Sequence, residues 1–211
     1  MRPVDQIQSH LEAIYDLEGV PRASDFLIDR DVMARLVDGG LISAGLADTD
    51  EQVLLLSHDD GVSLAVWLSE QVTEGLQGPR SLQVHCHATE AVSHFLMILW
   101  NAREGRQVRL LDLELQAEID KIVTALLDDL RVGGGAGGER LIRRLFDDVR
   151  FADYLTAEEH QRYREAHRLA RNYAARLAEL LGEGTDRLLA ELRRVYRLPS
   201  EGKFQHIARA A

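Results

Sequence analysis

The fold of this chain is decided by residues 108–130, which read VRLLDLELQAEIDKIVTALLDDL. Leucine, isoleucine, valine and alanine recur at positions that point in nearly every direction around a helix, and neither glycine nor proline interrupts them. A helix that is apolar on most of its sides needs neighbours on most of its sides. The segment therefore predicts the central helix of a helical bundle.

The same segment carries charged and polar side chains on two stripes of the predicted helix. The members of these stripes are Glu114, Glu118 and Lys121 on one, and Asp112, Gln116 and Asp120 on the other. A helix with neighbours on most sides cannot turn both stripes toward water. A buried carboxylate without a partner is costly enough to take up a proton or to find a cation. We therefore expect an adjoining helix to compensate at least one stripe.

Helical periodicity continues on both sides of this segment. It predicts four further helices, at 89–103, 139–149, 156–181 and 185–196. The glycine-rich run 133–138 is expected to be flexible, and it lacks the Lys and the Ser or Thr that complete a phosphate-binding loop. The helix at 156–181 places His160, His167 and several arginines at the edge of its core face. We expect this helix to supply cations for the acidic stripes.

The first 88 residues have a different pattern. Two helices are expected, at 6–17 and from Ser24 to Val37, and two strands at 52–57 and 62–68 flank a tight turn with the dipeptide Asp60-Gly61. Residues 82–87 alternate apolar and polar side chains, which allows either a third strand or a loop that leads into the next helix.

The expected fold class is therefore α+β and predominantly α. It has N-terminal helices with a small antiparallel β-hairpin or three-stranded sheet over 1–88, followed by a helical bundle over 89–211. These two parts are either separate domains or one continuous domain.

A cluster of polar side chains opens the helix predicted at 89–103. Residues 85–95 read HCHATEAVSHF, and Glu90 and His94 lie one helical turn apart on the same stripe. A carboxylate and an imidazole at this spacing can share a metal ion, or they can act as an acid–base pair. Their chemistry makes this run the first place to look for a site.

We hypothesise that this run and the acidic stripe form one site between three helices. Zinc or iron would be bound by side chains of the types that both metals accept, namely Glu90, His94, His167 and His87. Glu118 and Glu114 would be the catalytic residues, with Glu118 handling protons. The competing interpretation is a salt-bridged polar layer that only fixes the register of the helices. No motif is specific enough to name a reaction or to decide whether the protein is an enzyme.

Composition limits the surroundings and the partners of the chain. The chain has a single cysteine, Cys86, which excludes an intramolecular disulfide. Neither a signal peptide nor an apolar run of about 18 residues is visible. These features together indicate a cytoplasmic protein without a membrane span. The formal net charge of -10 disfavours nonspecific attraction to nucleic-acid phosphates and anionic lipids. Nucleic acid is therefore not expected among the partners.

The leading functional expectation is a soluble cytoplasmic binding or regulatory protein that engages a protein partner or a second copy of itself. It depends on the absence of a catalytic motif and on the aliphatic and arginine-rich helices, which suit interaction surfaces. The alternative is a metal-dependent enzyme, a hydrolase or an oxidoreductase, that uses the histidine and carboxylate site. A third option is a small-molecule sensor that uses the interior of the bundle.

Overall fold

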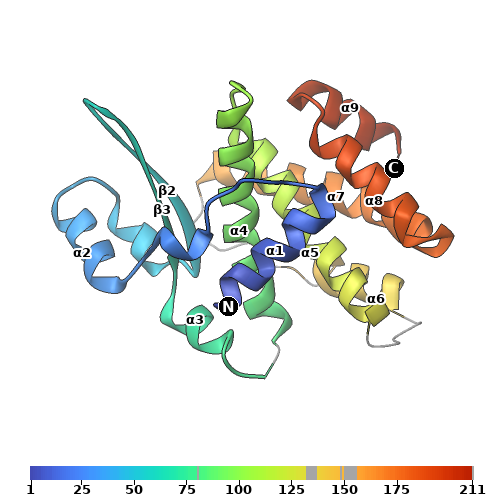
Figure 1. Ribbon diagram of the computed structural model, residues 1–211, viewed down its shortest axis with the longest axis horizontal. Helices are drawn as coiled ribbons and strands as arrows, with labels where there is room; N and C mark the ends of the chain where they lie inside the picture. The colour runs from blue at the N-terminus through green and yellow to red at the C-terminus, as the bar shows by residue number, and fades with distance from the viewer. Residues whose placement is uncertain (80, 132–136, 148, 150–155, 211) are drawn as a thin grey trace. The chain divides into compact units, whose positions relative to one another are not determined.

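The computed structural model describes residues 1–79, 81–131, 137–147, 149 and 156–210. The chain forms two compact units, one from residues 1–9 and 19–99 and the other from residues 10–18 and 100–211. Two helices, α1 (Pro3–Tyr15) and α4 (Leu82–Arg103), contribute residues to both units. The expected class, α+β with a predominance of helix, is confirmed (Figure 1).

The N-terminal unit contains a three-stranded mixed sheet with the strand order β1-β3-β2. Strand β1 runs parallel to β3, whereas β2 and β3 form an antiparallel hairpin. The elements of this unit that follow α1 are η1 (Ala23–Asp25), β1 (Leu27–Ile28), α2 (Arg30–Asp38), η2 (Ala44–Asp48), β2 (Glu51–His58), β3 (Gly61–Leu68) and α3 (Glu70–Gly75).

The predicted hairpin is confirmed. Eight residues of β2 pair with eight of β3 without a break in register, and Gly61 follows the turn with a φ of 145°, a backbone conformation that favours glycine. On one face of the hairpin, Leu54 and Trp67 pack with Met33 of α2. Figure 1 shows the tip of the hairpin projecting from the rest of this unit.

Two predictions for this part of the chain are wrong. Residues 82–87 are the first residues of α4 and neither a strand nor a loop, since six alternating residues fit several structures when a long helix follows. The helix expected from Ser24 begins only at Arg30, because Asp29 caps it by accepting a hydrogen bond from the Val32 amide at 2.8 Å. The preceding residues form the 3-10 turn η1 and the strand β1, and the Val66 amide of β3 donates to the Phe26 carbonyl at 2.8 Å.

The C-terminal unit is a helical bundle, as expected. The helix predicted at 108–130 is α5, and α7 packs along it and also contacts the two last helices. The segment predicted as one helix over 139–149 is a short α-helix followed by a π-helical turn. The elements of this unit that follow α4 are α5 (Leu110–Arg131), α6 (Gly137–Ile142), η3 (Arg143–Asp147), α7 (Ala157–Glu183), α8 (Thr185–Tyr196) and α9 (Ser200–Arg209).

The glycine-rich segment is described only in part. Of the run 133–138, residues 133–136 lie outside the described residues, and Gly137 begins α6. None of the helices in the described part of the chain combines the length and the hydropathy needed to cross a membrane.

Several arginines of this unit have structural roles at helix ends. Arg193 donates to the carbonyls of Ala13 and Ile14 at 2.9 and 3.0 Å, and Arg197 donates to the carbonyl of Asp16 at 3.1 Å. These carbonyls belong to the last turn of α1 and the residue that follows it, where helical partners are missing. Arginines 193 and 197 therefore fix the C-terminal end of α1 within this unit.

Candidate functional site

The first acidic stripe of α5 receives its cations from α5 itself and from α7. The Glu118 carboxylate accepts a hydrogen bond from Lys121 Nζ at 2.9 Å, and Nδ1 of His167 lies 3.4 Å from its other oxygen. The second ring nitrogen of His167 lies 2.9 Å from the carbonyl of Phe146 in η3. The imidazole is thus held between a carboxylate and a backbone carbonyl.

This arrangement favours the charged forms of both partners. Burial alone raises the pKa of Glu118, but the charge of Lys121 and the hydrogen bonds from His167 and Lys121 outweigh it and bring the pKa to about 2. Burial lowers the pKa of His167, but the hydrogen bonds to Glu118 and to the Phe146 carbonyl outweigh it, so that the pKa lies above its ordinary value. A carboxylate with such a low pKa is a poor proton donor near neutral pH.

The neighbouring carboxylate of the same stripe also faces a cation from α7. Glu114 is buried, and its Oε1 lies 3.6 Å from Nε of Arg162. The expectation that the helix at 156–181 compensates the acidic stripe is therefore confirmed for Glu114 and Glu118. Their roles as catalytic residues stay predictions.

The second stripe of α5 forms a buried polar network with α1 and α9. The hydroxyl of Tyr15 makes a short hydrogen bond to Asp120 Oδ1, and Gln116 Nε2 contacts both groups, at 3.0 Å to the hydroxyl and 2.9 Å to the carboxylate. Gln116 Oε1 accepts a hydrogen bond from Lys203 Nζ at 3.0 Å. All four side chains are almost inaccessible to solvent.

The other end of this stripe is Asp112, which α9 also contacts. Ser200 makes a short hydrogen bond to Asp112 Oδ2, and the same oxygen accepts from the Arg109 amide at 3.0 Å. Asp112 Oδ1 is buried and has no hydrogen-bond partner within the described residues, and the same holds for the hydroxyl of Tyr196. The network is therefore incompletely satisfied at two atoms.

Lys203 is the residue of this network that sequence reasoning missed. It lies on α9, a helix outside the helices expected from periodicity, and it is one of only two lysines among the 25 basic residues of the chain. Its Nζ lies 5.4 Å from the centre of the Tyr196 ring. Burial lowers its pKa to about 8, with the charges of Asp112 and Asp120 opposing the shift. The sequence signal for α9 was the helical spacing of two apolar residues, Phe204 and Ile207, which lie three positions apart after Pro199.

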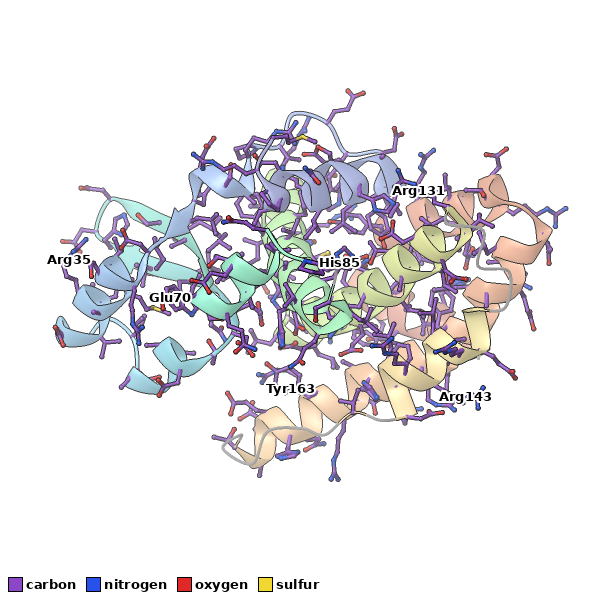
Figure 2. All side chains as sticks on the ribbon, turned by 90° about the horizontal axis from the view of Figure 1, so that it is seen from below. Arg35, Glu70, His85, Arg131, Arg143 and Tyr163 are labelled. Carbon is purple, nitrogen blue, oxygen red and sulfur yellow. The ribbon has the colours of Figure 1, made fainter. Side chains whose placement is uncertain are left out.

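The histidines of α4 lie on a continuous helix. His85 stands on its first turn (Figure 2), and Nε2 of His87 lies 3.4 Å from an Asp50 carboxylate oxygen. Glu90 and His94 are one helical turn apart on α4, as the sequence predicts, and both are half-buried. Of the proposed site residues, the structure brings the expected catalytic residue Glu118 and the expected ligand His167 together, and it places ligand atoms of Glu90 and His94 within 4.8 Å of each other. The convergence of Glu90 and His94 with that pair stays a prediction.

The open edge of the small sheet is a second candidate site, and sequence reasoning did not find it. Strand β2 is outermost in the order β1-β3-β2, and no other strand of the described chain pairs with it. Continuing the register of the ladder, Asp50 lies opposite Ser69, and the Ser69 amide donates to the Asp50 carbonyl at 2.9 Å. Val53 lies opposite Val66, whose amide donates instead to the Phe26 carbonyl on the other side of β3. In this antiparallel ladder the even-numbered residues of β2 therefore bond to β3. Residues 51, 53, 55 and 57 direct their backbone groups outward.

This edge is also apolar and exposed. Leu55 is 51% exposed on β2, and Val62, which is 63% exposed, lies on the same face of β3. The edge sequence Gln52–Ser57, QVLLLS, contains no lysine, proline or glycine, and the unbroken register shows that it has no bulge. Lysines, prolines and bulges are features by which proteins prevent edge-to-edge pairing of strands. Because this segment has none of them, β2 is an unprotected edge.

No protein-family model, no curated protein and no solved structure matches this chain.

Proposed function

We propose that this protein is a cytoplasmic binding protein whose β2 edge receives an extended segment of another polypeptide chain. The observation that carries the proposal is the open, unprotected edge of β2 with its outward backbone groups and exposed Leu55. A strand added there would gain main-chain hydrogen bonds from the outward residues and apolar contacts from the face that holds Leu55 and Val62. The single cysteine of the chain suits a reducing compartment.

The experiment uses a labelled peptide with the sequence of residues 50–59, DEQVLLLSHD, as the probe strand. Fluorescence anisotropy would measure its binding to the full chain and to Leu55→Lys, which places a charge on the edge. The matched control is Leu130→Lys, because Leu130 is 52% exposed and lies on α5. We expect Leu55→Lys to weaken binding at least about tenfold and Leu130→Lys to leave it unchanged. Equal affinities in both variants would refute an edge site.

The second candidate function is a metal-dependent hydrolase or oxidoreductase. A specific observation favours it, because Glu118 and His167 place a carboxylate and an imidazole 3.4 Å apart. The Lys121 ammonium, 2.9 Å from the same carboxylate, opposes it, since a cation already occupies that position. This pair alone is therefore a poor fit for a metal ion.

Elemental analysis of the purified protein tests the metal hypothesis directly. Stoichiometric zinc or iron that is lost in both His94→Ala and His167→Ala would establish a site that joins these histidines. Absence of transition metal after reconstitution would exclude the hypothesis.

A further inference from the structure

We propose that the strand that covers β2 is β2 of a second copy of this chain. The inference rests on the proposed function and names its partner. Two chains would pair antiparallel about a two-fold axis and join their three-stranded sheets into one continuous sheet, which covers the β2 edge of both copies.

The directions of the backbone groups limit how two copies can pair. Val53 and Leu55 direct their amides and carbonyls outward, so the paired hydrogen bonds across the new edge must join odd-numbered residues of both copies. A two-fold axis perpendicular to the sheet keeps each face on its own side. Residues on one face of β2 therefore meet residues on the same face of the second β2.

Side-chain chemistry selects the register that is centred on Leu54. It places Val53 opposite Leu55 of the partner subunit, twice by symmetry, and Leu54 opposite its own copy. It also places Asp50, whose carboxylate accepts from Ser69 Oγ at 3.1 Å and lies 3.4 Å from His87 Nε2, opposite His58 of the partner subunit at both ends, so that an acidic side chain faces an imidazole rather than a like charge.

The next register, centred on Leu55, is less favourable. It places Glu51 opposite Asp59 of the partner subunit, again twice, and like charges directly opposite each other destabilise a strand pair. The number of apolar pairs is the same in both registers, because Leu54 opposite Leu56 of the partner subunit replaces Val53 opposite Leu55 of the partner subunit. Charge complementarity thus separates two registers that differ by a shift of two residues.

The exposed apolar face supports the same partner. Leu55 and Val62 lie side by side on one face of the hairpin, and the two-fold axis brings the corresponding residues of both copies onto one face of the joined sheet. Each copy would then cover apolar surface of the other. An isologous contact of this kind needs only one self-complementary patch, which the sequence of β2 provides.

Light scattering during size-exclusion chromatography tests the association. We expect the full chain to change from 23.7 kDa toward twice that mass as its concentration rises from about 1 to about 100 μM. Leu55→Pro removes an outward amide without removing a hydrogen bond to β3, and it is expected to keep the chain monomeric. Leu55→Lys is also expected to keep the chain monomeric, because it places a charge on the edge of both copies. Leu130→Lys is the control variant that should still dimerise. A wild-type chain that stays monomeric, or variants that dimerise equally, would overturn the proposal.

Disulfide trapping tests the register. In a Cys86→Ala background, Val53→Cys and Leu55→Cys chains are mixed and mildly oxidised. Opposite residues of a hydrogen-bonded antiparallel pair have Cα atoms about 5.5 Å apart, within the range of a disulfide. The proposed register predicts a cross-linked heterodimer of the two variants. Self-cross-linking of Leu55→Cys alone would show the register centred on Leu55 and overturn this assignment.

The two sets of experiments separate the inference from the function on which it rests. If the wild-type chain is monomeric but binds the 50–59 peptide, and Leu55→Lys weakens that binding, self-pairing is refuted. The edge then remains a binding site for another polypeptide. A monomeric chain that binds the peptide with equal affinity in all variants refutes both.

Discussion

The Tyr15 hydroxyl donates a hydrogen bond to the carboxylate of Asp120, a residue 105 positions later in the chain. The two groups lie in the interior of the C-terminal unit, and burial, followed by the charge of Asp120, raises the pKa of Tyr15 well above its usual value. The phenol is therefore a fixed donor to a buried carboxylate. This contact ties the end of α1 to the central helix α5.

Removal of this donor is expected to destabilise the protein. Tyr15→Phe leaves Asp120 with one fewer donor in a buried position, and the expected loss is about 1–3 kcal/mol of unfolding free energy. Chemical denaturation followed by circular dichroism measures it. The matched control is Tyr196→Phe, because that ring stacks on Tyr15 at 4.3 Å and its buried hydroxyl has no hydrogen-bond partner in the described chain. The control should lose no stability. A larger loss in the control would contradict the assigned network.

Lys203 should give the protein a characteristic response to alkaline pH. Its pKa lies near 8 in the folded chain against 10.5 for an ordinary lysine, so the unfolded chain binds the extra proton between these values. Stability is therefore expected to rise with pH from 8 to 10.5, by up to about 3 kcal/mol, relative to Lys203→Met. Urea titrations across this range measure the difference. Lys121→Met is the control that retains Lys203 and should keep the rise.

The Glu118–His167 pair should contribute most at mildly acidic pH. The lowered pKa of Glu118 gives stability that is present above its ordinary value of 4.5 and is lost as the pH falls toward 2. The raised pKa of His167 gives stability that is present below 6.5 and is lost as the pH rises through its folded value. A double-mutant cycle of Glu118→Gln and His167→Gln should show coupling of about 0.5–3 kcal/mol near pH 5.5. Unchanged coupling at pH 9 would argue against this assignment.

Gly75 should tolerate no side chain, because of close packing between α3 and α4. A Cβ at this position would lie 2.7 Å from Cγ2 of Val84. We expect Gly75→Ala to cost about 1–3 kcal/mol through overpacking, and Val84→Ala in the same chain to recover part of the loss. Gly78→Ala is the control, since its nearest atom would lie at 3.8 Å. Thermal unfolding compares the three variants.

Local pattern was sufficient for some elements and insufficient for others. The bounds of α5, α7 and α8 follow from helical periodicity over long segments, and Asp60-Gly61 marks the hairpin. The two-residue strand β1 has no local signal, because its extended form depends on pairing with β3. The alternation over 82–87 was too short to outweigh the helix that follows.

The sequence by itself determined that α5 is central and that its carboxylates need compensation, because periodicity and desolvation are local properties of residues 108–130. The sequence also indicated the helix at 156–181 as a source of cations, but only the tertiary structure decided which side chains provide the compensation. Arg162 and His167 come from α7, and Lys203 comes from the last helix. It also decided that β3 lies between β1 and β2, which leaves β2 at an edge of the sheet. The physical reason is the same in both cases: pairing between segments distant in sequence depends on topology, which no short pattern of residues encodes.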